Sequence, residues 1–108
     1  MSNQPVLFEK TGQIACITLN RPERRNAFGK ELAAAMRATF RRVADDRELR
    51  VVILTGSGGS FCAGADLKDP DTHATASVSA YIEGGHIWDY FPRLNIPVIA
   101  AINGHAYG

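Results

Sequence analysis

Two uninterrupted apolar runs, each followed by a glycine-containing corner, constrain the fold of this chain more than any other feature. The runs are VVIL at residues 51–54 and VIAAI at residues 98–102, and glycines follow at positions 56 and 104. Such runs, without polar alternation, are typical of strands covered on both faces in a parallel sheet. Because parallel strands need crossover connections, the sequence predicts an α/β fold.

The first half of the chain supplies the other elements of such a fold. β-Prone segments at residues 6–10 and 14–19 are separated by Thr-Gly-Gln, which predicts a hairpin. An amphipathic helix is predicted from about residue 29 to residue 45. Its apolar positions recur at helical spacing and are Leu32, Met36, Phe40 and Val43. A helix between two strands implies a right-handed crossover.

The second half contains a polar stretch and a weaker helical pattern. Residues 69–77 carry a proline and no periodicity, so we expect a surface loop. Residues 78–91 predict a second helix, weakened by two adjacent glycines. The length of 108 residues leaves room for one domain at most.

Composition excludes several classes of function. The net charge of +1 gives no general attraction to nucleic acid or anionic membranes. Cys16 and Cys62 lack metal-ligand spacing, so we expect buried free thiols. His73, His86 and His105 have no partner at ligand spacing, so no metal site is expected. Without a signal pattern or an apolar run of membrane-spanning length, the expected location is the cytoplasm.

The first glycine corner, residues 56–68, does not match the common nucleotide or hydrolase motifs. A dinucleotide fingerprint beginning at Gly56 needs glycine where Phe61 stands, and a phosphate-binding loop ending at Gly64 needs lysine where Ala65 stands. No G-x-S-x-G nucleophile motif surrounds Ser57. Nucleotide binding and serine hydrolysis are therefore disfavoured.

What remains is a turn of very small residues, AGA at residues 63–65, after an apolar strand. Such a turn exposes backbone N–H groups at a helix start, where Asp66 is placed to open or cap the helix. Unpaired N–H groups suit the stabilisation of an oxygen that becomes negative, as in an oxyanion hole. The alternative is a tight strand-to-helix turn in which glycine serves only the backbone angles.

Four ordered motifs closely resemble the signatures of the enoyl-CoA hydratase/isomerase (crotonase) family. They are NRPERRNAF at 20–28, VVILTG at 51–56, SFCAGADL at 60–67 and IPVIAAINGHAYG at 96–108. The resemblance covers essentially the whole chain. It implies a crotonase-like spiral of ββα units, of which residues 1–108 would form the N-terminal, incomplete part, since family members are usually more than twice as long.

The resemblance also implies roles for particular residues. The N–H of Ala65 matches the first oxyanion-hole donor, and Gly108 matches the start of the corner that provides the second. The carbonyl of Ala63 matches the acceptor of the adenine amino group of coenzyme A, and Lys68 matches a basic position near its phosphates. The remaining implied substrate-binding positions are Gly64, Asp66, Arg24 and Arg25.

The family's acid and base residues match no position in residues 1–108, so the isolated chain is expected to be inactive. The resemblance implies an acyl-CoA thioester as substrate, no separate cofactor, a role in fatty acid metabolism and, at full length, a homotrimer or hexamer. Two alternatives stay open. One is a non-catalytic acyl-CoA-binding or interaction module, and the other is part of a dinucleotide-binding oxidoreductase, which Phe61 and Ala65 disfavour.

Overall fold

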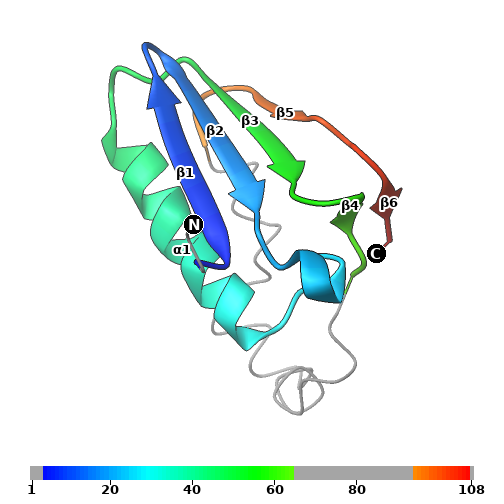
Figure 1. Ribbon diagram of the computed structural model, residues 1–108. Coiled ribbons are helices and arrows are strands. Elements are labelled where there is room, and N and C mark those ends of the chain that lie inside the picture. The colour runs from blue at the N-terminus through cyan, green and yellow to red at the C-terminus, as the bar shows by residue number, and fades with distance from the viewer. Residues whose placement is uncertain (1–3, 65–93, 108) are drawn as a thin grey trace.

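The computed structural model describes residues 4–64 and 94–107, whose course Figure 1 shows. Its elements in chain order are β1 (Val6–Thr11), β2 (Ile14–Leu19), η1 (Pro22–Arg24), α1 (Lys30–Asp45), β3 (Val51–Gly56), β4 (Ser60–Cys62), β5 (Val98–Ala100) and β6 (His105–Ala106). The predicted α/β class is confirmed. The loop expected at 69–77 and the helix expected over 78–91 lie outside the described residues.

The hairpin predicted at the start of the chain is present. β1 pairs antiparallel with β2, in a register that runs from Val6 opposite Leu19 to Thr11 opposite Ile14. Gly12 lies in the turn with φ 61°, a left-handed conformation that glycine adopts without steric cost. The Thr-Gly-Gln sequence therefore closes the hairpin as expected.

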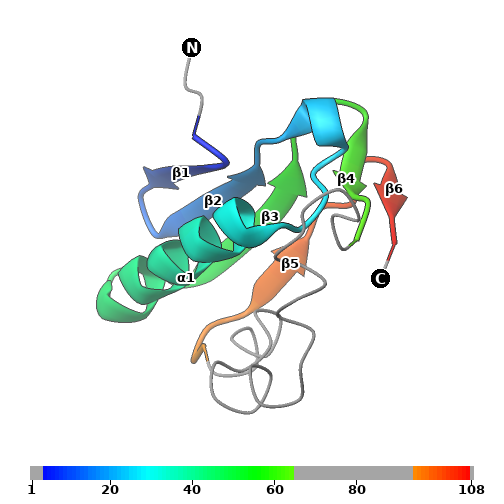
Figure 2. The same cartoon turned by 90° about the horizontal axis from the view of Figure 1, so that it is seen from below.

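The amphipathic helix is also confirmed and covers one face of the sheet. α1 spans Lys30–Asp45, and its buried residues are the four that the periodicity identified. Figure 2 shows α1 lying along one face of β1, β2 and β3. Within the two described segments, no helix is long and apolar enough to cross a membrane.

The main sheet has the strand order β1-β2-β3-β5. β2 is parallel to β3, as the crossover through α1 between them requires. β3 is also parallel to β5. The core lies between this sheet and α1, where Ala15, Ile17, Leu19, Met36 and Val52 are completely buried. A second, two-stranded sheet pairs β4 with β6.

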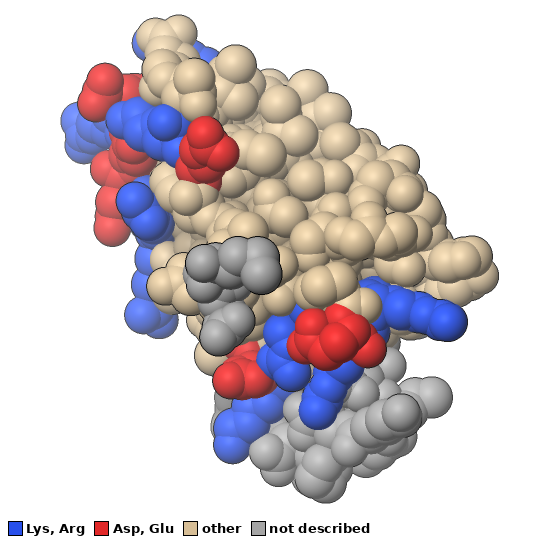
Figure 3. All heavy atoms as spheres, viewed as in Figure 1, with Lys and Arg blue, Asp and Glu red and all other residues tan. Residues whose placement is uncertain are grey.

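The prediction that both apolar runs are covered on two faces is wrong for the described residues. In β3, Val52 and Leu54 are buried but Ile53 is only half-buried, while Ile99 is 54% and Ile102 60% exposed. The reason is that α1 packs against one face, and among the described elements no helix covers the other. Figure 3 shows that opposite side, where charged side chains gather at the margins. β5, at Val98–Ala100, is also shorter than its apolar run at residues 98–102.

We predict that Met36→Ala lowers the free energy of unfolding by about 2–5 kcal/mol, because it leaves a cavity between α1 and the sheet. Urea denaturation followed by circular dichroism measures this change. Arg37→Ala is the matched control on the exposed side of the same helix, with an expected change within about 0.5 kcal/mol. Equal stability of the two variants would contradict this packing.

Candidate active site

The fold brings the two glycine-containing corners side by side. The first corner, residues 56–68, contains β4, and the second corner, residues 103–108, contains β6. These strands pair in parallel, with Ser60 opposite His105 and Cys62 opposite Ala106. The N–H of Tyr107 donates to the carbonyl oxygen of Cys62 at 2.9 Å. Two segments more than 40 residues apart in sequence thus lie side by side as paired strands, as Figure 1 shows.

Gly104 permits this close approach. A Cβ atom at position 104 would collide with the carbonyl oxygen of Gly59 and would lie 3.0 Å from Cα of Ser60. Both obstacles are backbone atoms, which cannot move aside as a flexible side chain can. The glycine of the second corner is therefore required by contact with the first.

Asn103 fastens the second corner to the end of β3. Its side-chain amide donates to the carbonyl oxygens of Gly56 at 2.8 Å and Gly58 at 3.3 Å. Its side-chain oxygen accepts the N–H of Gly56 at 3.2 Å. One side chain thus satisfies both backbone groups of Gly56, much as a neighbouring strand would.

The segment around η1 holds the first corner from the other side. The N–H of Ala63 donates to the carbonyl oxygen of Arg25 at 3.0 Å, and the N–H of Phe28 donates to the carbonyl oxygen of Gly64 at 2.6 Å. Gly64 is buried with φ 88°, a left-handed conformation that favours glycine. Ala63 and Gly64 are therefore fixed by main-chain hydrogen bonds rather than by side-chain packing alone.

Asn26 lies between these two contacts and is completely buried. Its amide donates to the carbonyl oxygens of Ser57 at 3.1 Å and Ser60 at 3.0 Å, and its side-chain oxygen accepts the N–H of Arg21 at 2.7 Å. Sequence reasoning singled out neither Asn26 nor Asn103. A usable signal is that both occur inside the quoted motifs and beside turns, where asparagine readily bonds to backbone.

Arg24 and Arg25, predicted to border the substrate, are both exposed at the end of η1. The contact that Arg25 makes with the first corner uses its main-chain carbonyl. Arg21 is occupied differently, since its guanidinium pairs with Glu23 and Glu31. The hydrogen bond that it donates to the Glu23 carboxylate is the main cause that raises its pKa. The three arginines therefore differ: the guanidinium of Arg21 is held in ion pairs, whereas Arg25 contacts the first corner through its backbone.

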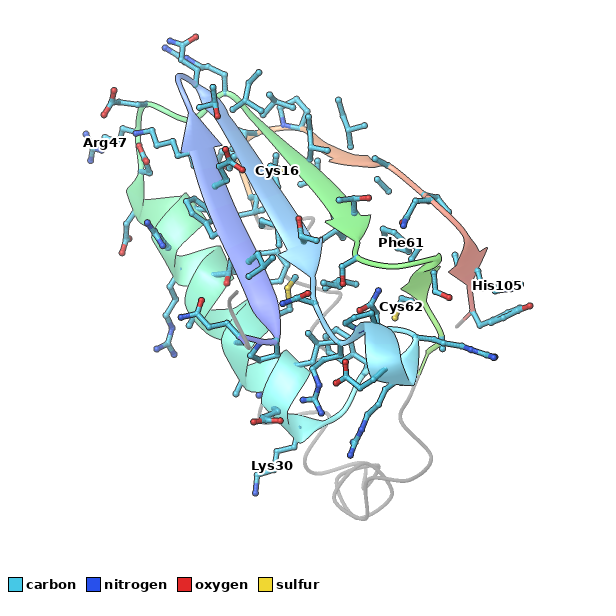
Figure 4. All side chains as sticks on the ribbon, viewed as in Figure 1. Cys16, Lys30, Arg47, Phe61, Cys62 and His105 are labelled. Atoms are coloured by element: carbon cyan, nitrogen blue, oxygen red, sulfur yellow. The ribbon has the colours of Figure 1, made fainter. Side chains whose placement is uncertain are left out.

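The side chains at the paired corners provide little reactive chemistry. Burial raises the pKa of the Cys62 thiol, partly offset by a hydrogen bond from the backbone of Gly64, so the thiol is a poor nucleophile at neutral pH. The prediction of buried thiols is confirmed for Cys62, whereas Cys16 is half-buried. Figure 4 shows Phe61 and Cys62 on β4 and His105 on β6.

His105, in β6, is in contact with Tyr107, which follows this strand. Its ring stacks on that of Tyr107 with centroids 5.5 Å apart, and its Nδ1 lies 3.2 Å from the tyrosine hydroxyl. Over residues 4–64 and 94–107, no three His, Cys, Asp or Glu side chains are grouped to hold a metal ion. The predicted site residues Ala65, Asp66, Lys68 and Gly108, together with His73 and His86, lie outside the described residues.

The class of protein follows from sequence comparison. A family model described as Enoyl-CoA hydratase/isomerase matches residues 9–108. The chain therefore belongs to the enoyl-CoA hydratase/isomerase family. It is 37% identical over 107 residues to the (E)-benzylidenesuccinyl-CoA hydratase of Thauera aromatica, covering 96% of this chain and 41% of that protein. It is also 37% identical to the short-chain-enoyl-CoA hydratase of Clostridium acetobutylicum, covering 95% and 40%.

Solved structures confirm the crotonase-like fold. The enoyl-CoA hydratase of Bacillus anthracis is similar with a TM-score of 0.79 and 33% identity, over 94% of this chain and 40% of that one. A Pseudomonas aeruginosa protein gives a TM-score of 0.83 with 34% identity, over 100% of this chain and 48% of that one. The chain thus spans about 40% of the length of the curated relatives quoted above.

We predict that Gly104→Ala separates the two corners, because its methyl group meets the backbone of Gly59 and Ser60. The expected result is faster hydrogen exchange at the Tyr107 amide, which donates to Cys62. Gly59→Ala is the matched control, since a Cβ there meets nothing within 4 Å. Unchanged exchange in Gly104→Ala would show that this contact is not required.

Proposed function

We propose that this chain forms part of an acyl-CoA enzyme that polarises a thioester carbonyl through a backbone oxyanion hole. The observation that supports it best is the parallel pairing of β4 with β6, which aligns the ends of the two corners. The family resemblance associates the first corner with the first N–H donor and places the second donor just after the second corner, in the glycine run that begins at Gly108. Hydrogen-bonded strands suit such donors, because N–H groups that are already fixed need no reorganisation as negative charge develops on the carbonyl oxygen.

The N–H of Ala65 is the proposed first donor. The carbonyl of Gly64, the preceding residue, accepts the N–H of Phe28. Because a trans peptide group is planar, we propose that this bond is the contact from which the following N–H takes its direction. The second donor is proposed to follow the corner that begins at Gly108. Both donors would then act on one thioester oxygen.

The remaining positions are proposed to bind the coenzyme A portion. The carbonyl of Ala63 would accept the adenine amino group, and Lys68 would act as a point charge near the phosphates. Gly64 and Asp66 flank the first donor in the chain. Arg24 and Arg25, whose side chains are exposed, would border the site.

The wider context is likewise proposed from the family. The substrate is an acyl-CoA thioester and no separate cofactor is needed. The intact enzyme would be a cytoplasmic homotrimer or hexamer in fatty acid metabolism, acting as a lyase or isomerase. The alternative is a non-catalytic acyl-CoA-binding module, because the family's acid and base residues match no position in residues 1–108.

We predict that this protein binds crotonyl-CoA in preference to NAD. The expectation follows from the first corner, in which Phe61 and Ala65 stand where nucleotide-binding loops need glycine and lysine. Isothermal titration with each compound measures the preference, and free adenosine is the control for adenine binding alone. Tighter binding of NAD would favour the oxidoreductase alternative.

We also predict negligible hydration of crotonyl-CoA by residues 1–108 alone. Loss of one oxyanion donor costs about 2.7–4 kcal/mol of barrier stabilisation, and missing acid and base groups cost roughly 10²- to 10⁴-fold more in rate. Steady-state assays of the purified 108-residue chain, with a complete family enzyme as control, test this. Comparable turnover by the two would contradict the assignment of acid and base to residues outside this segment.

A further inference from the structure

Asn26 is the only side chain with an amide or a charged group that is completely buried among the described residues. Its two amide hydrogens and its oxygen all bond to backbone, at Ser57, Ser60 and Arg21. A buried amide normally carries a cost unless its hydrogen bonds are formed, and here each donor has an acceptor. Its contacts therefore hold main chain and do not reach a ligand.

The position of this amide relates it to the candidate active site. The hydrogen bonds of Arg25 with Ala63 and of Phe28 with Gly64 lie on either side of it in the sequence. Its own amide bonds reach Ser57, before β4, and Ser60, the first residue of β4, which lead to Ala63 and Gly64. Asn26 thus joins the η1 segment to the first corner along one continuous line of contacts.

The backbone at this point is held in an unusual conformation. Arg25 and Asn26 are consecutive non-glycine residues with positive φ, 52° and 57°. Asparagine tolerates the left-handed region, whereas arginine is rarely found there. Such strain persists only where surrounding contacts fix it, and it is concentrated at functional sites. The bonds of Asn26 are the side-chain contacts that fix it here.

We propose that Asn26 is a positioning residue for thioester polarisation. Its amide fixes the η1 segment against β4, so that Phe28 can hold the carbonyl of Gly64 and thereby orient the peptide group that follows. This inference rests on the proposed function, because it concerns the aim of the same oxyanion donor. A donor misplaced by about 1 Å can cost about 10²-fold in rate.

Two variants separate the amide from the backbone conformation. Asn26→Asp preserves shape and the acceptor for Arg21, but replaces the donor to Ser57 and Ser60 with an oxygen. Asn26→Gly keeps the left-handed conformation without any side chain. The matched control is Asn20→Asp, which makes the same chemical change where the amide donates to the carbonyl of Gln4 at 2.9 Å.

The test measures the infrared stretch of a ¹³C-labelled crotonyl-CoA thioester carbonyl bound to the intact protein. We expect the wild type and Asn20→Asp to lower this frequency, and both Asn26 variants to lose most of that lowering. For turnover we expect kcat to fall about 10²-fold in the Asn26 variants with a smaller change in KM. Circular dichroism establishes that each variant is folded.

An unchanged carbonyl frequency in a folded Asn26 variant would overturn the inference while leaving the proposed function intact. Unfolding of both Asn26 variants, with a folded Asn20→Asp, would also overturn it, because the residue would then serve the fold alone. Failure of the wild type to bind crotonyl-CoA or to lower the frequency would overturn the proposed function, and this inference with it.

Discussion

The contact between two backbone corners is the constraint on which the rest of the structure depends. Gly104 lets the main chain beside β6 approach Gly59, and β3 and β5 are parallel neighbours, so that β4 and β6 can pair. The main sheet therefore delivers both corners to one place. The core beneath α1 supplies the stability that holds this edge, and the asparagine amides fix its details.

In the proposed oxyanion hole the donors are main-chain N–H groups, so residues that position the backbone would matter more than residues with reactive side chains. Side chains at such a site would have to be small, as in residues 63–65, so that a ligand could approach the backbone. The geometry of such a site would then depend on residues that hold the backbone in place without touching the ligand. Asn103 satisfies both backbone groups of Gly56, and Asn26 holds Ser57 and Ser60. These amides satisfy backbone N–H and C=O groups in an irregular segment, as hydrogen bonds between neighbouring strands do in a sheet.

The sequence predicts elements whose cause is local and misses contacts whose cause is remote. The four apolar positions of α1 recur at helical spacing, and the Thr-Gly-Gln turn sets the hairpin, so both are readable. The partners of the Asn26 amide lie 31 and 34 residues away, and those of Asn103 up to 47. No periodicity carries that information. The glycine corners themselves were visible because tiny residues after an apolar run are unusual wherever they occur.

The prediction that both apolar runs are covered on two faces failed because it also depended on contacts remote in sequence. An uninterrupted run such as residues 51–54 gives the average apolar character of a strand but not the extent of cover on each face. The alternation appears only in the structure, where Val52 and Leu54 meet α1 and Ile53 points to the other side. Exposure of Ile99 on the neighbouring strand follows from the same one-sided packing. Pattern alone therefore fixes the element and leaves its second face undetermined.

The proposed main-chain donors would also separate carbonyl polarisation from proton transfer. A backbone N–H remains a donor across the whole pH range in which proteins fold, and burial keeps the Cys62 thiol neutral further into the alkaline range than usual. Carbonyl polarisation by the proposed main-chain donors is therefore expected to be independent of pH. Any pH dependence of catalysis in the proposed enzyme must then arise from groups that carry the proton, which the family resemblance assigns to no residue of this segment. Carbonyl polarisation and proton transfer can accordingly be measured separately.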